Sequence, residues 1–596
     1  MFFRNAILCL FGAVLIATVG GCQQSSPLNQ AKTPTALSPD TIASVHWLGK
    51  KEVGITFGAY YFSRIWQQPQ TAQLERQTLY KLAIAPSLWL PNGNNLTTND
   101  VPRLWQLLND LVQEESYLEI RHADAARPQV VFAIKLSNDQ AAQWLTNLPA
   151  LLEPLLAVHQ PVTPSAAGWT LQTTDTLNRV QCVRLGSWLL VGAAADANPL
   201  LSEITTRIHR DGVPFISAGT NLWLEANLKP SSLAVTFPAL FQGDTLRPSD
   251  GRGWREATGE GQPAAEGGSS FRSQVLAAPK PGEGGSIFHL LSSLSAFNLS
   301  LSGDGANVIT RAHLKLAKPM VESLTPWQLP LPLLHEPLAS FTAMRGIQPL
   351  LEEWDWWKLI SGGTPPPDQL FLWSLSGSPY QVYLAASLPD PLVGTPGSDV
   401  RGQGRDASLR RPQVASLCDA LMTNGNPWLA AHGYISFDRE PDGNGVTWGN
   451  LPDIRPFIKF AGDSSEGWLY AGLTPDTDTN HMSPPQGMIQ YILQRTNLLY
   501  YDWEVTGPRM QPVLTLAQTT RQVVRSPELP LNSASLTCLG SIIQRLGTSA
   551  SMINRTGPAE LTFYRRSTLG FTAIELQLIA DWLESPQFPR GLHSIK

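Results

Sequence analysis

Hydrophobic residues recur along the first part of the chain with two spacings, and each spacing predicts one type of element. The leucines of residues 101–112 lie at helical spacing, with Asp100 suited to cap the helix and Pro102 to its first turn. Two further helices are predicted, one starting at Asn138 or Asp139 and one over residues 198–208. Apolar runs predict strands at 130–136, 169–173, 179–185 and 187–193. Because strands follow one another without strict β-α-β alternation, the pattern predicts an α+β fold with antiparallel pairing.

The second part of the chain has the same mixture of helical and strand patterns. A helix is predicted over residues 347–359, and the turn residues at 442–445 predict a hairpin between strands at 434–437 and 445–448. Near the end, Thr572 and Glu575 have the spacing of a capping box, which predicts a helix through Trp582. The alternation of apolar residues at 574, 576 and 578 would also suit a strand.

Three segments of the first part recur in the same order in the second part. They are Gln129–Leu136 with Gln381–Leu388, Ser187–Gly192 with Gly467–Gly472, and Thr220–Leu222 with Thr496–Leu498. The offsets are 252, 280 and 276 residues (382 − 130, 468 − 188 and 497 − 221). We therefore predict two similar α+β halves, each a mainly antiparallel sheet with helices packed on one face, and a ligand site in the crevice between them. The alternative is chance similarity between half-buried strands, whose patterns repeat easily.

Segments rich in Pro, Gly and polar residues divide the chain. Residues 22–44 are predicted to be a flexible tether, and residues 242–286 and 389–412 to be insertions, the first of them disordered. The proline-rich residues 326–337 are predicted to be a linker between a first half, 45–325, and a second half, 338–596. The aromatic segment 54–66 is expected to pack on the first half.

The first residues indicate export. Arg4 is the only charge before an apolar run, residues 6–19, that is too short to span a bilayer. This pattern predicts a signal peptide over residues 1–21. The following residues Val19, Gly20, Gly21 and Cys22, with a polar stretch after them, resemble the lipobox of bacterial lipoproteins. The resemblance implies that the Cys22 thiol carries a lipid, that Cys22 is the mature N-terminus, and that Gln23 favours the outer membrane. An ordinary cleaved signal is the alternative.

Composition narrows the class of protein. Hydrophobic residues make up 43% and charged residues 15% of the 596, which is typical of a globular chain. The net charge of -5 is spread along the chain without a basic stripe, so nucleic acid is not an expected partner. Besides Cys9 and Cys22, the cysteines are Cys182, Cys418 and Cys538, among which at most one disulfide can form.

No sequence motif identifies a catalytic mechanism. The chain lacks the nucleophile-elbow, zinc-protease, C-x-x-C and phosphate-loop patterns, and its histidines are scattered, so we predict no cofactor and no metal. One cluster combines acidic and aromatic side chains in the way that sugar-binding sites do: Glu352, Glu353, Trp354, Asp355, Trp356 and Trp357. The alternative is that these tryptophans pack in the core, since they point around most of a helix.

The sequence therefore predicts an exported protein that is anchored to the membrane by its N-terminal lipid and faces the periplasm or the cell exterior. Its function is expected to be binding or structural, with an envelope protein or a polysaccharide as partner. Two alternatives remain open. One is a polysaccharide hydrolase that uses the carboxylates of residues 352–355, and the other is a carrier of an apolar ligand.

Overall fold

The computed structural model describes most of the chain. The described residues are 35–89, 95–122, 128–156, 158–165, 167–173, 179–217, 219, 221–237, 294–320, 324–352, 357, 365–387, 410–431, 436–440, 445–449, 454–462, 467–476, 482–523, 533–585 and 588–589. The predicted signal peptide, Cys22 and the predicted insertion 242–286 lie outside these residues, as does the predicted insertion 389–412 up to residue 409.

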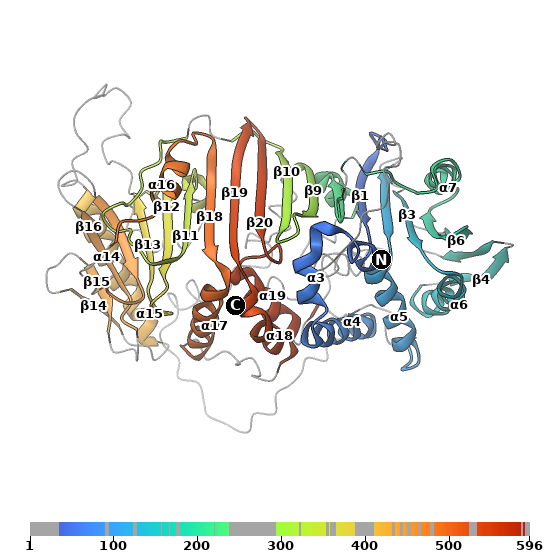
Figure 1. Ribbon diagram of the computed structural model, residues 1–596, viewed down its shortest axis with the longest axis horizontal. Helices are drawn as coiled ribbons and strands as arrows, with labels where there is room; N and C mark the ends of the chain where they lie inside the picture. Colours follow the sequence, from blue (N-terminus) through green and yellow to red (C-terminus); the bar gives the residue numbers. More distant parts are fainter. Residues whose placement is uncertain are drawn as a thin grey trace, which may run out of the picture.

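Twenty strands of the described residues form one antiparallel sheet (Figure 1). The strands of the first part are β1 Thr41–Trp47, β2 Ser116–His122, β3 Pro128–Lys135, β4 Val158–Ser165, β5 Gly168–Thr173, β6 Arg179–Leu185, β7 Trp188–Ala194, β8 Leu224–Leu228, β9 Leu294–Gly303 and β10 Val308–Leu316. Those of the second part are β11 Leu338–Arg345, β12 Gln369–Leu375, β13 Val382–Ser387, β14 Phe437–Arg439, β15 Gly445–Trp448, β16 Phe457–Gly462, β17 Gly467–Gly472, β18 Leu498–Val505, β19 Thr548–Gly557 and β20 Glu560–Ser567. The predicted α+β class with antiparallel pairing is confirmed.

The pairing of β1–β10 is reproduced by β11–β20. In the first part the strands follow the order β4-β5-β6-β7-β3-β2-β1-β8-β9-β10. In the second part the order is β14-β15-β16-β17-β13-β12-β11-β18-β19-β20, the same with each number raised by ten. The sequence matches lie on β3 and β13, on β7 and β17, and just before β8 and β18, which hold equivalent places in the two orders.

Strands β10 and β20 join the two parts. Residues 308–315 of β10 pair with residues 560–567 of β20 along their whole length, so the sheet continues without interruption from one part to the other. At the junction the two parts are therefore joined by paired strands, and the predicted ligand site between the halves stays a prediction.

Helices lie on both faces of the sheet. The face that we call inner packs against α3 Tyr60–Trp66, α4 Pro69–Trp89, α5 Asp100–Gln113, α6 Asn138–Leu155, α14 Arg410–Ala420, α17 Thr506–Val523, α18 Ala534–Ile542 and α19 Ala573–Glu584. The outer face is covered by α7 Pro199–Asp211 and α16 Gln486–Leu493. Shorter helices are α2 Lys50–Val53, α8 Pro230–Thr236, α12 Gln348–Glu352 and α15 Asn426–Ala431, with 3₁₀ helices η1 Phe57–Ala59 and η5 Ile543–Arg545 and the π-helical segment η4 Leu421–Gly425.

The expectation that helices pack on only one face therefore differs from the structure. The physical reason is that both faces carry large buried apolar side chains, such as Leu118 on the inner face of β2 and Phe341 on the outer face of β11. Antiparallel strands with two apolar faces need cover on both sides. The helices α7 and α16 supply the outer cover in equivalent places, since α7 precedes β8 and α16 precedes β18.

The largest core cluster crosses from the first part to the second. Trp47 and Leu118 on the inner face of the first part belong to the same cluster as Leu539 of α18 and Leu576 of α19. In Figure 1, α17–α19 lie in a row with α3–α5 below the central strands. The Lys81 ammonium of α4 donates a hydrogen bond to Glu584 of α19 at 3.1 Å. The last helices of the chain thus complete the core of the first part.

Two predicted connecting segments are partly packed into the fold. Trp327 and Leu334 of the predicted linker 326–337 are buried in the outer-face core of the second part, and the Arg345 guanidinium lies 4.7 Å from the Trp327 ring centroid. Strand β1 begins at Thr41, inside the predicted tether 22–44. Both segments contain apolar side chains that a sheet can bury, which their proline content conceals.

The predicted terminal helix is confirmed. Thr572 accepts a hydrogen bond from the Glu575 backbone N–H, and the Glu575 carboxylate accepts one from the Thr572 N–H, which completes the capping box of α19. None of the helices in the described part of the chain combines the length and the apolar character needed to cross a membrane.

Candidate functional site

The structure describes two of the six residues of the predicted acidic and aromatic cluster. Glu352 is exposed at the end of α12 and accepts a hydrogen bond from the Gln348 amide at 2.9 Å. Trp357 is half-buried and packs against the inner-face cluster around α14. Residues 353–356 lie outside the described residues. Among the residues described, this cluster therefore brings no second carboxylate to Glu352.

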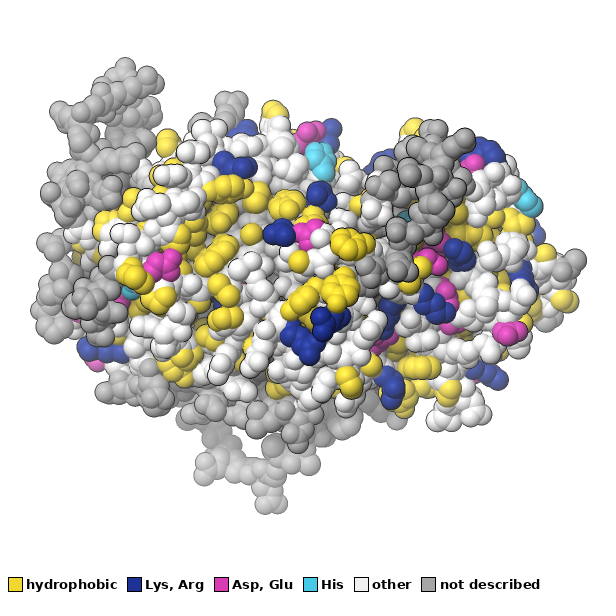
Figure 2. All heavy atoms as spheres, in the orientation of Figure 1, with side chains coloured by type: hydrophobic (Ala, Val, Ile, Leu, Met, Phe, Trp, Pro, Cys, Tyr) yellow, Lys and Arg dark blue, Asp and Glu magenta, His cyan; other side chains and the backbone are white. Residues whose placement is uncertain are grey.

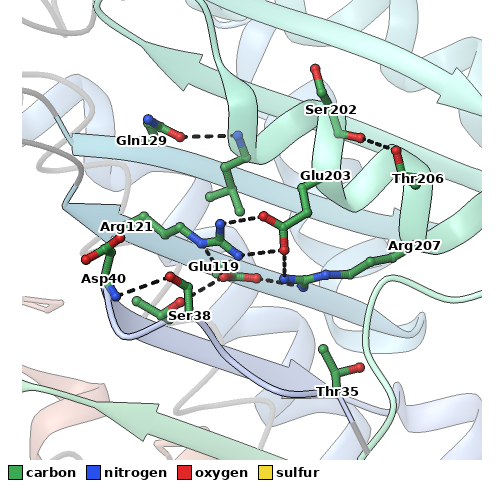
Figure 3. Close-up of polar contacts among 12 residues, drawn as sticks. Thr35, Ser38, Asp40, Glu119, Arg121, Gln129, Ser202, Glu203, Thr206 and Arg207 are labelled. Atoms are coloured by element: carbon green, nitrogen blue, oxygen red, sulfur yellow. Dashed lines mark hydrogen bonds and ion pairs between the residues drawn. The ribbon is translucent and has the colours of Figure 1, made fainter. Parts of the chain in front are cut away.

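A buried carboxylate in the first part, Glu119, accepts four hydrogen bonds, and Figure 3 shows it beside Arg121, Arg207 and Glu203. Glu119 of β2 is fully buried on the outer face. One of its oxygens accepts from the Thr41 hydroxyl at 2.9 Å and the Arg121 Nε at 2.8 Å. The other accepts from the Tyr117 hydroxyl at 2.7 Å and the Arg207 guanidinium at 2.9 Å. All the lone pairs that this carboxylate directs at its surroundings are therefore used within the fold.

A second carboxylate holds the same two arginines. Glu203 of α7 accepts from both terminal nitrogens of Arg121, at 2.5 and 2.9 Å, and from Arg207 at 2.6 Å. The hydrogen bond from Arg121 is the main cause that lowers the pKa of Glu203 to about 2. Burial raises the pKa of Glu119, but the charge of Arg207 and the other donors outweigh it and lower the pKa overall. Two carboxylates thus balance two guanidinium groups, and the cluster fastens α7 to β2.

The second part has a cluster of buried carboxylates and arginines on the opposite, inner face, beneath α17 and α19. Glu504 of β18 accepts a hydrogen bond from the Ala573 backbone N–H at 2.8 Å and lies 3.2 Å from Arg509 of α17. Asp502, two residues earlier on the same face, accepts from the Thr342 hydroxyl at 2.7 Å. The hydroxyls of five serines on adjacent strands extend this polar layer: Ser340, Ser374, Ser549, Ser551 and Ser567.

Arg565 of β20 closes the layer at its other end. Its guanidinium donates to the Ser551 hydroxyl at 2.9 Å and to both oxygens of Glu575 at 2.7 and 2.8 Å. Glu575 is also the capping residue of α19, so the carboxylate that starts the helix also neutralises the buried arginine. The layer therefore depends on the position of α19.

The charges of this layer are less well compensated than those around Glu119. Burial raises the pKa of Asp502 and of Glu504, and burial lowers the pKa of Arg509. Within the described residues, Asp502 Oδ2 and the hydroxyls of Ser549 and Ser567 are buried without a hydrogen-bond partner. Buried polar groups of this kind favour the protonated form of a carboxyl. The arrangement can hold a proton, but its carboxylates do not face an open cleft.

His335 has the surroundings of a structural residue. Its Nε2 lies 2.5 Å from the Asp476 carboxylate and its Nδ1 lies 3.2 Å from the Glu336 carbonyl oxygen. The ring is buried, and both nitrogens are engaged within the fold. Neither nitrogen is then available to take a proton from a substrate.

Sequence reasoning missed an apolar band on the inner face, where the two parts meet. One or two residues from each of six strands form it: Met344, Tyr500, Ile553, Phe563, Leu561, Leu314 and Phe297. The register pairs Met344 with Tyr500, Tyr500 with Ile553, Ile553 with Phe563, Leu561 with Leu314 and Leu314 with Phe297. All seven side chains are only partly buried. The period-two alternation of these strands would have identified one apolar face, but not its exposure.

A basic group lies at the edge of this apolar band. Arg555 pairs with Leu561 across β19 and β20 and also lines a shallow open hollow of about 400 Å³, together with Leu324 and Thr496. An apolar surface next to a guanidinium suits a molecule with an apolar body and an anionic group.

Metal and thiol chemistry have no site in the described part of the chain. No group of three or more His, Cys, Asp or Glu side chains there could hold a metal ion. Cys182, Cys418 and Cys538 are free and buried, and burial raises the pKa of each thiol, to about 12 for Cys182 and about 11 for Cys418. Comparisons of the chain with protein-family models, with curated proteins and with solved structures find no match.

Proposed function

We propose that this chain is an exported, lipid-anchored envelope protein that binds a partner or ligand on the inner face of its long sheet. The apolar run 6–19 and the lipobox-like residues ending at Cys22 support export and anchoring. Gln23, the residue directly after Cys22, supports the outer membrane over the inner. In this proposal the sheet faces the periplasm or the cell exterior.

The apolar band is the observation that carries the binding proposal. Seven apolar or aromatic side chains remain partly exposed across six strands, although the sheet buries large side chains elsewhere on both faces. With strands about 4.8 Å apart, the band is about 24 Å long. Partly exposed apolar side chains that lie side by side across several strands form a continuous apolar strip, which suits a binding surface. Its chemistry, with Arg555 at the edge, supports an amphipathic ligand and so favours the apolar-ligand carrier.

We also infer that the two parts of the sheet are duplicated halves. The identical strand order and the positions of the three sequence matches support this inference. The apolar band crosses the junction between β10 and β20, so it is formed only when both halves are present.

The hydrolase alternative has less support. A glycosidase needs two carboxyl groups that face each other, about 5 to 10 Å apart, across an open cleft. Glu352 is exposed and bonded to Gln348, while Glu119 and Glu504 are held by arginines within the fold. These three carboxylates are therefore held within the fold or exposed singly, and none of them faces a second carboxyl group of the described residues across a cleft.

The anchoring proposal is tested by mass spectrometry of the mature N-terminus. We expect Cys22 to be the first residue and to carry a diacylglyceryl group. An unmodified N-terminus at another residue would contradict it. Fractionation of the envelope then tells the inner membrane from the outer.

The binding proposal is tested with a fluorescent fatty acid, 11-(dansylamino)undecanoic acid, as probe. Phe563→Thr removes the central ring of the band, and Tyr564→Thr makes the same change on the outer face of the same strand. We expect Phe563→Thr to weaken binding at least about fivefold, because contact with roughly one aromatic ring is lost, and Tyr564→Thr to leave it unchanged. Equal effects of the two variants, at equal stability in urea, would argue against the band as the site.

A further inference from the structure

An exposed group of apolar side chains lies at the end of the central strands where α3 begins. The exposed fractions are 48% for Ile55, 72% for Phe57 and 50% for Tyr60. The same segment buries Phe62 and Trp66 in the core. The segment 54–66 thus packs on the first part as expected, but it directs three large side chains outward. We call Ile55, Phe57 and Tyr60 the exposed apolar patch.

The patch is held by backbone contacts to the β9–β10 hairpin. The Gly305 N–H donates to the Gly58 carbonyl oxygen at 2.6 Å, and the Tyr61 N–H donates to the Gly305 carbonyl oxygen at 3.1 Å. A Cβ atom at Gly58 would lie 2.5 Å from the Gly303 carbonyl oxygen, so this close approach requires glycine. The exposed side chains therefore project from a fixed backbone.

Three exposed arginines lie on the patch segment, contact it, or pair with the hairpin that contacts it. The Arg64 guanidinium lies 5.8 Å from the Tyr60 ring centroid. The backbone oxygen of Arg545 accepts a hydrogen bond from the Tyr61 hydroxyl, and the Arg545 side chain is exposed. Arg566 is also exposed and pairs with Asp304, the neighbour of Gly305 in the hairpin. Figure 2 shows hydrophobic side chains beside a group of Lys and Arg side chains near the middle of one face.

We propose that the exposed apolar patch inserts into the surface of an anionic bilayer. Aromatic and aliphatic side chains next to arginines are the combination that binds the region between lipid headgroups and acyl chains. The positive charge of Arg64 and Arg545 complements anionic headgroups. A single apolar patch binds weakly, so this inference rests on the proposed N-terminal lipid, which supplies the first attachment.

The chain length between anchor and body permits this contact. Thirteen residue steps separate Cys22 from Thr35 (35 − 22), and a chain of that length spans at most about 45 Å. Strand β1, which separates Thr41 from the patch end of the sheet, has seven residues and is about 23 Å long. The anchor therefore does not prevent the patch from reaching the bilayer.

The test places a fluorophore at the patch in the full chain. Phe57→Cys labelled with a nitrobenzoxadiazole dye is compared with Leu493→Cys, which places the same dye at a side chain that is 46% exposed at the end of α16. The described natural cysteines are buried with raised thiol pKa values, and the unsubstituted chain measures the background. Vesicles of phosphatidylethanolamine and phosphatidylglycerol with a nitroxide lipid serve as probe, and flotation measures attachment.

We expect nitroxide quenching at residue 57 to exceed that at residue 493 at least twofold. If the protein floats with the vesicles but the two sites are quenched equally, insertion of the patch is overturned and the lipid anchor stands. If the protein does not float, both insertion of the patch and the lipid anchor are overturned. Quenching with an unmodified N-terminus would support the patch and contradict the proposed lipid. If the dye at residue 57 is shielded from solvent in intact envelopes but not on vesicles, the patch binds a protein partner and the membrane contact is overturned.

Charge reversal supplies a second measurement that does not depend on the dye. Arg64→Glu and Arg545→Glu are each expected to weaken binding to the anionic vesicles about fivefold, and to have no effect on vesicles of phosphatidylcholine alone. Arg439→Glu, an exposed arginine in the second half, is the control. Equal losses in all three variants would contradict a local patch.

Discussion

The two halves of the sheet have the same strand order, but their clusters of buried carboxylates and arginines lie on opposite faces. In the first half Glu119 and Arg207 lie on the outer face, beneath α7, while Trp47 and its neighbours make the inner face apolar. In the second half Asp502 and Glu504 lie on the inner face, beneath α17 and α19, and the outer face is aromatic. Each half thus has its carboxylate and arginine cluster on one face of the sheet, beside the apolar cores that both faces carry.

This difference shows that strand order and the choice of polar face are separate properties. Successive side chains of a strand alternate between faces, so either face can be made polar without changing the pairing. What each polar face requires is a helix that brings the opposite charge. The helix α7 supplies Arg207 to Glu119, and α17 supplies Arg509 to Glu504.

The largest effect is expected for loss of Glu119. Glu119→Ala leaves Arg207 and Arg121 without their buried partner, and we expect the free energy of unfolding to fall by about 3–5 kcal/mol. Urea unfolding measures it. The control is Glu560→Ala, whose ion pairs with His313 and Lys315 are solvent-exposed, with an expected loss below about 1 kcal/mol. Similar losses in both variants would contradict the proposal that the Glu119 cluster fastens α7 to β2.

A change of opposite sign is expected in the second half. Asp502→Asn keeps an oxygen that accepts the hydrogen bond from Thr342 and removes the negative charge. Burial raises the pKa of the Asp502 carboxyl, and this outweighs the lowering by Arg509 and Arg565. A raised carboxyl pKa means that the folded state binds the extra proton, so Asp502 destabilises the fold as pH rises above about 4. We expect Asp502→Asn to be about 1 kcal/mol more stable than the natural chain at neutral pH.

The pH dependence sharpens the contrast between the halves. The advantage of Asp502→Asn should shrink as pH falls towards about 4 and disappear below about pH 3, where the carboxyl is neutral in both the folded and the unfolded state. For Glu119, whose pKa is lowered, the loss in Glu119→Gln should be complete above about pH 4.5 and shrink as pH falls further. Urea unfolding across this range measures both. A pH-independent difference in either variant would show that its charge is not the cause.

The smallest contrast concerns the cysteines. Cys182 of the first half and Cys418 of the second are both buried, with thiol pKa values raised to about 12 and about 11. We expect both to react with a disulfide reagent at least about a hundredfold more slowly than in urea, and Cys182 more slowly than Cys418. Mass spectrometry of labelled peptides measures each site. Fast labelling of Cys182 in the native chain would contradict its packing.

Local sequence patterns predicted many elements correctly. The strand over residues 179–185 and the capping box of α19 are as predicted, and the predicted helix 101–112 is α5 with one more residue at each end. These signals act within one or two turns or along one strand, so they do not depend on the rest of the fold. In contrast, β1 and α4 were missed. All seven residues of β1 are buried, so it lacks the polar and apolar alternation of a half-exposed strand, and α4 contains Pro86 and has little amphipathic character.

The candidate site could be predicted only in part. The signal peptide and Cys22 can be recognised in the sequence. The apolar band cannot, because its residues come from six strands that lie at the end of the first half and across most of the second half. The predicted Trp and carboxylate cluster was chosen for the chemistry of adjacent residues. Adjacent residues on a helix point in different directions, so adjacency says little about a site.

Spacing and capping are local properties of the chain, so the amino-acid sequence was enough to predict the type of many elements and to find the three matching segments. The pairing of β10 with β20, the packing of α18 and α19 into the core of the first half, and the face on which each charge cluster lies became visible only in the folded chain. These features arise from contacts between residues hundreds of positions apart. Such contacts depend on the packing of whole helices against a sheet, which no local pattern contains.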